Sequence, residues 1–389
     1  MSSWREYKLG EIISSNNKSI DKNYELENIQ YLDTGSITNG KIDAFQEFKI
    51  SEAPSRAKRL VKHQDIVYST VRPIQRHFGF IENSQKNLVV STGFSVIETN
   101  QKLAYPKFVY YFLSSDETVE ILDVIAEAST SAYPSLKPSD IENLDISLPP
   151  LEEQKAIAEV LSSLDDKIDF LHRQNKTLED LAQTLFRQWF IEEAKEEWEV
   201  GKLPDEFDLT MGLSPSGDTY NEEQNGMPMF QGNADFEFRF PTNRVYTTDP
   251  KRIAERFDTL VSVRAPVGAQ NMAKEQCCIG RGVASFRYKF DNSFYTYTYY
   301  KMHSLMEEIK QFNETGTVFG SIGKSDFENI EIIKPPFEYV SKFQNEVKPI
   351  DDKIILNCEQ IKSLKNLRDT LLPKLLSGEV KIDNIRENR

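Results

Sequence analysis

The chain of 389 residues repeats itself, and this internal repeat is the feature that most limits how it can fold. The segment 139–150 matches the segment 325–336, and the two are separated by 186 positions. At the same separation, residues 139–185 are identical to their counterparts at 18 of 47 positions, without a gap. Self-similarity of this kind means that one structural unit occurs twice. The chain is therefore expected to fold as two related halves, each with a divergent first part and a better-matched second part.

The divergent part of each half is predicted to be mixed, with strands dominant. Short stretches of β-branched and aromatic residues lie between Gly, Asn and Pro, which is typical of strands joined by turns. The clearest predicted strands are 65–70, 88–90, 94–97 and 260–263, and the predicted helices are 108–113 and 297–306.

A Pro-Pro pair opens the better-matched part of each half, and a long helix is predicted after each pair. Apolar residues recur there in alternating steps of four and three, which is the seam of a coiled coil. The seam is Leu161, Leu164, Ile168, Leu171, Asn175, Leu178 and Leu185 in the first helix, and Val347, Ile350, Ile354, Asn357, Ile361, Leu364 and Leu371 in the second. Two matched seams in one chain most simply pack on each other. Pro349 is expected to kink or interrupt the second helix near its start.

The two helices are predicted to pack antiparallel about a pseudo-twofold axis, with Asn175 facing Asn357. In such an arrangement the residue numbers of two facing positions always add up to the same value. The pair Asn175 and Asn357 therefore determines all the other facing pairs. The register opposes Leu171 to Ile361, Ile168 to Leu364, Leu178 to Ile354 and Leu185 to Val347, and each of these pairs is apolar. Two facing amides can satisfy each other and fix the register at some cost in stability.

The net charge of −14 argues at first against a nucleic-acid partner. Two windows are nevertheless basic. Residues 49–107 hold ten Lys and Arg against four Asp and Glu, and residues 239–301 hold eleven against five. Both windows fall in the divergent parts, so they are candidates for phosphate contacts, although chance clustering on solvated faces would give the same pattern.

Motifs for enzymatic chemistry are absent or incomplete. The three cysteines form no C-x-x-C pair that could hold zinc, and the four histidines show neither metal-ligand spacing nor a triad. The sequence 323–325 ends like a phosphate-binding loop, but Val318 stands where that motif needs its first glycine. Lys334 precedes two prolines where adenine methyltransferases need a polar acceptor. A catalytic role is therefore not expected.

The sequence also lacks the marks of secretion or membrane insertion. The first residues contain no apolar core of a signal peptide, and no apolar run approaches the length of a membrane span. A soluble, cytoplasmic protein without a membrane partner is expected.

Several stretches carry a resemblance to a known family. In the first half these are 148–158, which reads Leu-Pro-Pro-Leu-Glu-Glu-Gln-Lys-Ala-Ile-Ala, together with 161–168 and 185–190. In the second half they are 258–266, 279–282 and 368–378. Along essentially its whole length, the chain resembles the specificity subunit of type I restriction–modification systems.

The resemblance implies an α+β fold with a pseudo-twofold internal repeat. Two target recognition domains, mixed and β-rich, would be residues 1–148 and 196–334. Two helical conserved regions, residues 149–195 and 335–389, would join them. The long helices of these regions would pack as an antiparallel coiled coil that holds the recognition domains apart.

The resemblance also implies a function. Each recognition domain would read one half of a bipartite site in double-stranded DNA, and the protein itself would be non-catalytic. Two modification subunits would dock on it and methylate adenine with S-adenosylmethionine, and restriction subunits would add translocation and cleavage driven by ATP with Mg²⁺. The chain itself is expected to bind no cofactor and no metal.

Candidate DNA contacts are the basic, amide and imidazole side chains in and near the two basic windows. Arginine and lysine can pair with phosphates, whereas amides and histidine can reach base edges. The candidates are Arg56, Lys58, Arg59, Arg72, Gln75, Arg76 and His77 in the first domain, and Gln231, Asn233, Arg239, Arg244, Arg252, Arg264 and Arg281 in the second.

Two other classes of function stay open at this point. A coiled-coil assembly scaffold without DNA specificity of its own would need the helices but not the basic windows. A self-sufficient methyltransferase or nuclease would need cofactor motifs, which are missing. DNA recognition accounts best for divergent domains on a repeated scaffold, because two unlike half-sites require domains that differ.

Overall fold

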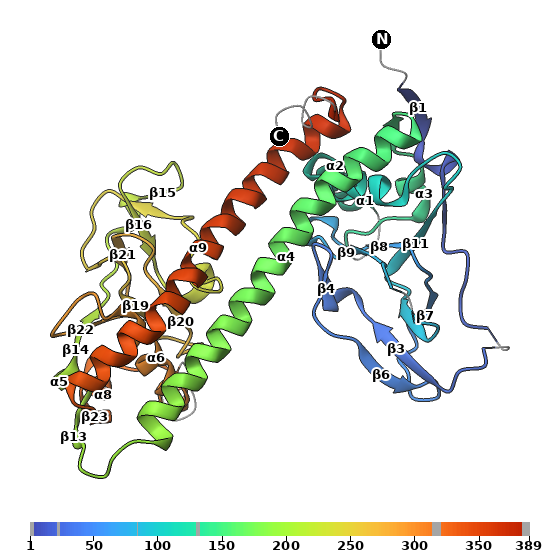
Figure 1. Cartoon of the computed structure of the whole chain (residues 1–389). Helices are drawn as coiled ribbons and strands as arrows, with labels where there is room; N and C mark the ends of the chain where they lie inside the picture. The colour runs from blue at the N-terminus through green and yellow to red at the C-terminus, as the bar shows by residue number, and fades with distance from the viewer. Residues whose placement is uncertain (1–3, 22–23, 84, 130–132, 313–319, 383–389) are drawn as a thin grey trace. The chain divides into compact units, whose positions relative to one another are not determined.

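The computed structural model describes residues 4–21, 24–83, 85–129, 133–312 and 320–382 (Figure 1). The chain forms two compact units. Unit 1 contains Met1–Ile168 and Ser363–Arg389, and unit 2 contains Asp169–Lys362. Each unit therefore combines a strand-rich body with part of the two long helices, α4 (Leu151–Arg187) and α9 (Phe337–Leu376).

The strand-rich body of unit 1 contains two four-stranded sheets, ordered β6-β3-β10-β7 and β2-β11-β8-β9. Strand β1 pairs with β12, and β4 pairs with β5. The strands are β1 (Arg5–Lys8), β2 (Ile13–Ser15), β3 (Asn28–Leu32), β4 (Ile37–Thr38), β5 (Lys41–Ile42), β6 (Gln46–Lys49), β7 (Ala57–Leu60), β8 (Ile66–Ser69), β9 (Phe78–Phe80), β10 (Leu88–Ser91), β11 (Phe94–Thr99) and β12 (Asp145–Leu148). The 3-10 turns are η1 (Leu9–Glu11), η2 (Thr34–Ser36) and η3 (Pro73–Gln75).

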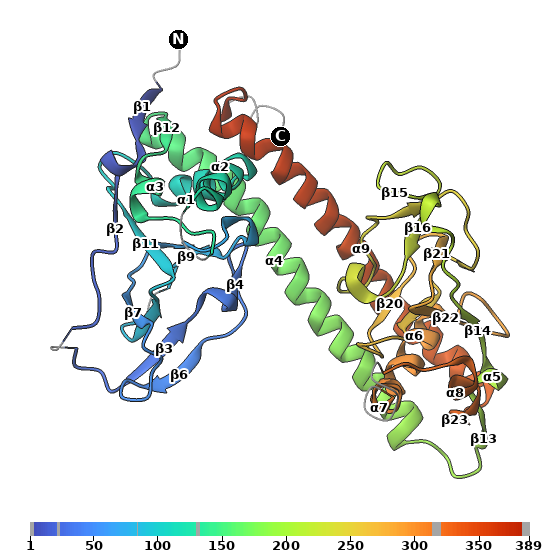
Figure 2. The same ribbon diagram turned by 180° about the vertical axis from the view of Figure 1, so that it is seen from behind.

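The largest apolar cluster of unit 1 forms where the sheet β2-β11-β8-β9 meets the helices. Helices α1 (Pro106–Ser114), α2 (Asp116–Glu127) and α3 (Pro138–Glu142) gather beside the first turns of α4 (Figure 2). Tyr68 of β8, Phe108 of α1, Leu122 of α2 and Leu161 of α4 belong to one cluster and are almost completely buried. Burying these large apolar side chains is the main source of stability for such a body.

Unit 2 repeats this arrangement with sheets ordered β14-β22-β19-β20 and β15-β17-β16-β21-β18, and β13 pairs with β23. The strands are β13 (Glu199–Lys202), β14 (Phe207–Met211), β15 (Tyr220–Asn221), β16 (Met227–Phe230), β17 (Tyr246–Thr247), β18 (Ile253–Ala254), β19 (Thr259–Ser262), β20 (Gln270–Met272), β21 (Cys277–Ile279), β22 (Val283–Tyr288) and β23 (Glu331–Lys334). The helices are α5 (Leu203–Glu206), α6 (Tyr295–Ser304), α7 (Met306–Gln311) and α8 (Lys324–Asn329), and the remaining turns are η4 (Gln188–Glu192, a π turn), η5 (Gly217–Thr219) and η6 (Asn233–Asp235).

The two bodies share one topology. The antiparallel sheet β2-β11-β8-β9 corresponds to β14-β22-β19-β20, and the parallel pair β3–β10 corresponds to β16–β21. The ladder β1–β12 corresponds to β13–β23. The repeat therefore extends through the divergent parts of the sequence, and the chain has the α+β fold with the internal repeat that was expected.

The observed elements overlap the predicted ones. Strands β8, β10, β11 and β19 lie on the four predicted strand segments, and α1 covers the first predicted helix. The second predicted helix is divided, because α6 ends at Ser304 and α7 begins at Met306.

The seam residues of both long helices are buried or half-buried, as the heptad pattern predicts. In unit 2, Asn175 and Asn357 are fully buried, and Asn357 Nδ2 donates to Asn175 Oδ1 over 2.8 Å. Asn357 Nδ2 also lies 2.8 Å from Gln174 Oε1. The two asparagines face each other as predicted, so the antiparallel register derived from the repeat is confirmed at this pair.

We expect Asn175→Leu to destabilise unit 2 by about 1–3 kcal/mol, because the buried amide of Asn357 then loses its partner. Replacing both asparagines with leucine removes both polar groups, so the double variant should be at least as stable as the native chain. Thermal unfolding of the two variants tests this. A double variant less stable than Asn175→Leu would contradict the compensating pair.

The expected interruption at Pro349 is wrong. Helix α9 runs from Phe337 to Leu376 through Pro349 and Pro373. A proline in a helix deprives the carbonyl four residues earlier of its partner. Those carbonyls belong to Asn345 and Asp369, which are both exposed, so water can replace the missing donor.

Candidate nucleic-acid interface

In each unit, three loops meet at one edge of the strand-rich body. Strands β3 and β10 are parallel, as are β16 and β21, so the carboxyl ends of each pair lie at the same edge. We call residues 33–36, 70–77 and 91–93 loop edge 1, and residues 231–235, 263–269 and 280–282 loop edge 2.

Backbone hydrogen bonds tie the loops of loop edge 1 together. The N–H of Thr70 donates to the carbonyl of Gly93 over 2.9 Å, and the N–H of Thr92 donates to the carbonyl of Arg56 over 2.9 Å. Thr34 lies against Gly93, where a Cβ would come within 3.0 Å of its methyl group. Arg56 therefore belongs beside this edge although it lies on another segment.

The loop 70–77 has an unusual backbone. Arg72 and Arg76 flank η3 and both have left-handed conformations, with φ of 47° and 57°. Such conformations are uncommon for residues other than glycine and are stabilised by surrounding contacts. The carboxylate of Asp123 accepts the N–H of Ile74 over 3.1 Å, and Arg76 Nη2 lies 2.6 Å from Asp116 Oδ1. These contacts hold Arg72 and Gln75 at the exposed tip of the loop.

Loop edge 2 is assembled in the same way. The N–H of Val263 donates to the carbonyl of Gly282 over 2.9 Å, and the N–H of Gly280 donates to the carbonyl of Phe230 over 2.8 Å. A Cβ on Gly282 would lie 2.1 Å from the carbonyl oxygen of Gln231. Only glycine allows this close approach, which leaves the Arg281 side chain exposed between two glycines.

Equivalent positions of the two edges carry different side chains. Val71 forms an isolated bridge with Ser135, and Arg264 forms the same bridge with Ser321, the repeat counterpart of Ser135. In unit 1, Thr92 precedes Gly93, whose carbonyl accepts the N–H of Thr70. In unit 2, Arg281 precedes Gly282, whose carbonyl accepts the N–H of Val263. One framework thus presents neutral residues in unit 1 where unit 2 presents arginines.

The candidate DNA contacts fall into three groups by exposure. The exposed residues are Arg56, Lys58, Arg72, Gln75, Gln231, Arg244, Arg252, Arg264 and Arg281. The half-buried residues are Arg59, Arg76, His77 and Asn233. Arg239 alone among the candidates is fully buried.

Several candidates already have partners within the protein. His77 Nδ1 lies 2.6 Å from the carbonyl of Ile37, and Arg244 Nε lies 2.8 Å from Asp235 Oδ1. Arg76 Nη2 lies 2.6 Å from Asp116 Oδ1. These contacts favour a positioning role within the loops for part of the set.

The expectation for Arg239 as a DNA contact is wrong. Its guanidinium is buried between helices of unit 2 and forms ion pairs with Glu179 and Asp351, at 3.1 Å and 3.0 Å. A phosphate cannot reach this group, because protein atoms cover it completely.

The sequence analysis missed the side chains that support Gln231. Ser214 Oγ donates to Gln231 Oε1 over 2.7 Å, and Gln231 Nε2 lies 2.6 Å from the hydroxyl of Tyr220. The same Ser214 hydroxyl accepts the N–H of Arg281 over 3.1 Å. No motif marks Ser214 or Tyr220, and only the Gly-Arg-Gly stretch signals that a close backbone approach occurs here.

Among residues whose placement is described, no group of three or more His, Cys, Asp or Glu is arranged to hold a metal ion. Within the same part of the chain, no helix is long and apolar enough to cross a membrane. Cys277 and Cys278 are buried on β21, and burial raises the pKa of Cys277.

Two β-rich bodies of one topology, each with a loop edge and part of the two long helices, define a duplicated protein with two unlike loop edges. The family model for the type I restriction modification DNA specificity domain matches residues 1–180 and 195–366. The chain belongs to this family.

Known relatives agree with this assignment. The type I restriction enzyme HindI specificity subunit of Haemophilus influenzae is 28% identical, over 98% of this chain and 100% of its own. The putative MjaX specificity subunit of Methanocaldococcus jannaschii is 30% identical, over 92% and 88%. The solved type I restriction-modification S subunit from M. genitalium shares the fold, with a TM-score of 0.61 and 18% identity over 96% of both chains.

Proposed function

We propose that this chain reads double-stranded DNA for a type I restriction–modification complex, with each loop edge reading one half of a bipartite site. The observation that carries the proposal is the presence of two equivalent edges with different side chains. Val71 and Thr92 in loop edge 1 correspond to Arg264 and Arg281 in loop edge 2. Unlike half-sites present different patterns of donors and acceptors, so they require this kind of difference on a common frame.

The exposed cations supply phosphate contacts in this proposal. Arg56 and Arg72 would serve loop edge 1, and Arg264 and Arg281 would serve loop edge 2, because their side chains are exposed. Phosphate contacts fix position and orientation but carry no sequence information. Base reading would then depend on neighbouring groups such as Gln75 and Asn233.

The proposal assigns no catalysis to this chain. Two modification subunits would methylate adenine with S-adenosylmethionine, and restriction subunits would use ATP and Mg²⁺, so that every cofactor belongs to a partner. The acidic remainder of the chain suits the docking of basic partner surfaces. Such a complex would act in the cytoplasm.

The direct test compares modification subunits with and without this chain, using a DNA duplex that contains the target and a scrambled control. We expect sequence-selective binding only when the chain is present, with affinity that falls steeply as salt rises. Equal selectivity without the chain would leave only the scaffold function. Methyl transfer by the purified chain alone would instead establish an enzyme.

A further inference from the structure

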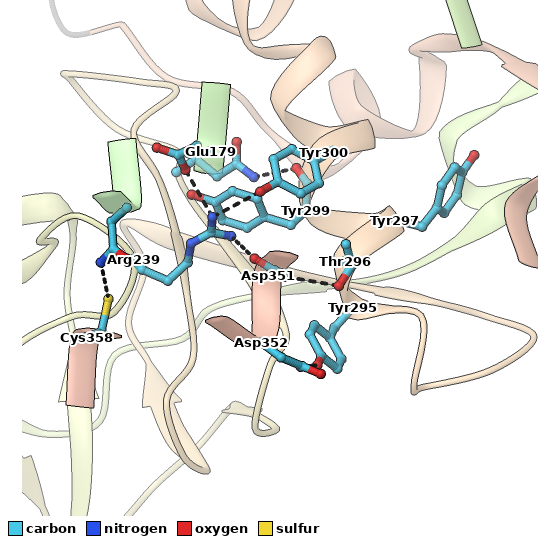
Figure 3. Close-up of polar contacts among 12 residues, drawn as sticks. Glu179, Arg239, Tyr295, Thr296, Tyr297, Tyr299, Tyr300, Asp351, Asp352 and Cys358 are labelled. Carbon is cyan, nitrogen blue, oxygen red and sulfur yellow. Dashed lines mark hydrogen bonds and ion pairs between the residues drawn. The ribbon is translucent and has the colours of Figure 1, made fainter. Parts of the chain in front are cut away.

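Arg239 is held by both long helices of unit 2. Its Nη2 lies 3.1 Å from Glu179 Oε1 on α4, and its Nη1 lies 3.0 Å from Asp351 Oδ1 on α9 (Figure 3). Nη2 also donates to the hydroxyl of Tyr300 over 3.2 Å, and the guanidinium lies 3.9 Å from the ring centroid of Tyr299. The arginine and Asp351 have no solvent exposure, and the Glu179 side chain is 17% exposed.

These charges depend on one another. Burial raises the pKa of Asp351 and of Glu179, and the guanidinium of Arg239 opposes both rises. Asp351 receives a further hydrogen bond from the Thr296 hydroxyl, at 3.0 Å. A buried charge that loses its partner is strongly unfavourable, so the segment that carries Arg239 is bound firmly to the helices.

The repeat shows what unit 1 does at the same place. Asp165 is the counterpart of Asp351, and its Oδ1 lies 2.8 Å from Nη1 of Arg368 on α9. The tyrosine hydroxyl of Tyr111 donates to Asp165 Oδ2 over 2.7 Å. The counterpart of Arg368 in the repeat is Ala182, a fully buried residue of α4. In unit 1, the cation that neutralises Asp165 therefore comes from a long helix. In unit 2, the cation that neutralises Asp351 comes from the strand-rich body.

The segment that carries Arg239 leads directly to loop edge 2. Residues 236–244 follow η6, which contains Asn233 and Asp235. The N–H of Thr242 donates to the carbonyl of Asp235 over 2.8 Å, and Arg244 pairs with the carboxylate of the same residue. One end of this segment thus forms part of the loop edge, while Arg239 anchors its middle between α4, α6 and α9.

We propose that Arg239 is a positioning residue, which ties the segment 236–244 to the helices and thereby fixes Asn233 and Arg244 for recognition of the second half-site. This inference rests on the function proposed above. Neutralising Asp351 alone would not require Arg239, because an arginine on α4 could do it as Arg368 does in unit 1. Because Arg239 belongs to the strand-rich body, its ion pairs also connect the segment 236–244 to α4 and α9. An arginine on α4 could not make this connection.

The test moves the cation from the segment to the helix. The double variant Ala182→Arg/Arg239→Ala keeps a guanidinium beside Asp351 but removes the link, and Arg239→Lys keeps both a cation and the link. Amide hydrogen exchange in residues 236–244 of the full chain measures, without any DNA, how firmly this segment is held to the helices. We expect about tenfold faster exchange in the double variant than in Arg239→Lys, at comparable thermal stability.

The second readout is DNA recognition by the assembled complex. The double variant should lose roughly tenfold in discrimination against substitutions in the second half-site, with unchanged discrimination in the first. Native exchange and native discrimination in the double variant would overturn the proposal, because neutralisation alone would then suffice. Should that variant not fold, Arg239→Met replaces it, and native exchange in a folded Arg239→Met chain would overturn the proposal in the same way.

The two readouts separate this inference from the proposed function. Failure of the native complex to select any sequence would overturn the proposed function and, with it, the recognition role of Arg239. Sequence selection by the native complex together with an unaffected second half-site in the double variant would overturn only the role of Arg239.

Discussion

Replacing Phe343 with alanine is expected to destabilise unit 2 by about 3–5 kcal/mol, the usual cost of truncating a buried phenylalanine. Phe343 has no solvent exposure and lies at the centre of an aromatic cluster. Its ring centroid is 5.5 Å from that of Phe186, 5.2 Å from that of Phe190 and 6.4 Å from that of Tyr297. These rings come from α4, η4 and α6, so the cavity would weaken the packing of both long helices against the body of unit 2.

Phe337→Ala is the matched control for this prediction. It lies on the same helix but is 55% exposed, with one ring contact at 5.6 Å to Phe294. The substitution Phe337→Ala should lower the free energy of unfolding by less than about 1 kcal/mol, as most substitutions of exposed residues do. Denaturant unfolding of both variants provides the measurement. Equal destabilisation by the two substitutions would contradict the assignment of Phe343 to the core.

The second large effect concerns loop edge 2. Replacing Arg264 or Arg281 with alanine should weaken DNA binding by the assembled complex roughly 10- to 100-fold, because each variant loses a charge-assisted contact to phosphate. Each loss should also reduce the slope of log affinity against log salt by about one. The fold should be unaffected, since both side chains are exposed.

Arg187→Ala supplies the control of equal charge change for the two arginine variants. Arg187 ends α4, is exposed and lies outside both loop edges. Its removal should leave affinity and salt slope close to the native values. Native affinity for Arg264→Ala and Arg281→Ala across a salt titration would remove both residues from the interface.

The helical scaffold could be predicted from the sequence because its pattern is local and repeated. The steps of four and three identify the seam, and the separation of 186 residues fixes which positions correspond. The facing pair Asn175 and Asn357 then follows from symmetry and apolar matching. Helix propensity and seam packing act together along such a segment, so few alternatives remain.

The burial of Arg239 could not be predicted in this way. A lone arginine in a basic window has the same local pattern whether it faces water or two carboxylates. Its partners, Glu179 and Asp351, lie far from it in the sequence and on different helices. The repeat also misleads here, because Ala182 stands where the other half has Arg368.

Each long helix also carries a glutamine that binds the backbone near the start of a helix in its own unit. Gln154 Oε1 accepts the N–H of Tyr105 over 2.8 Å, and Gln344 Oε1 accepts the N–H of Tyr297 over 3.0 Å. The repeat counterpart of Gln154 is Val340, so the same task is done one helical turn later in α9. Tertiary packing preserved the contact while the sequence register changed.

The loop edges lie between these extremes. The basic windows 49–107 and 239–301 contain two of the three loops of each edge, but residues 33–36 and 231–235 lie outside them. Thr92 and Arg281 occupy equivalent places, which the hydrogen bonds from Thr70 to Gly93 and from Val263 to Gly282 reveal. Long-range strand pairing leaves no periodic signal in the sequence, and single-residue roles at such edges therefore required the structure.

The central claim is that two separate edges of this chain read two halves of one DNA site. The most direct measurement maps the adenines methylated by the assembled complex in a random DNA library, for the native chain, Gln75→Ala and Asn233→Ala. The account predicts a motif of two defined halves around an undefined spacer, with the first variant relaxing one half and the second relaxing the other. A continuous motif, or a motif in which both variants relax the same half, would contradict it.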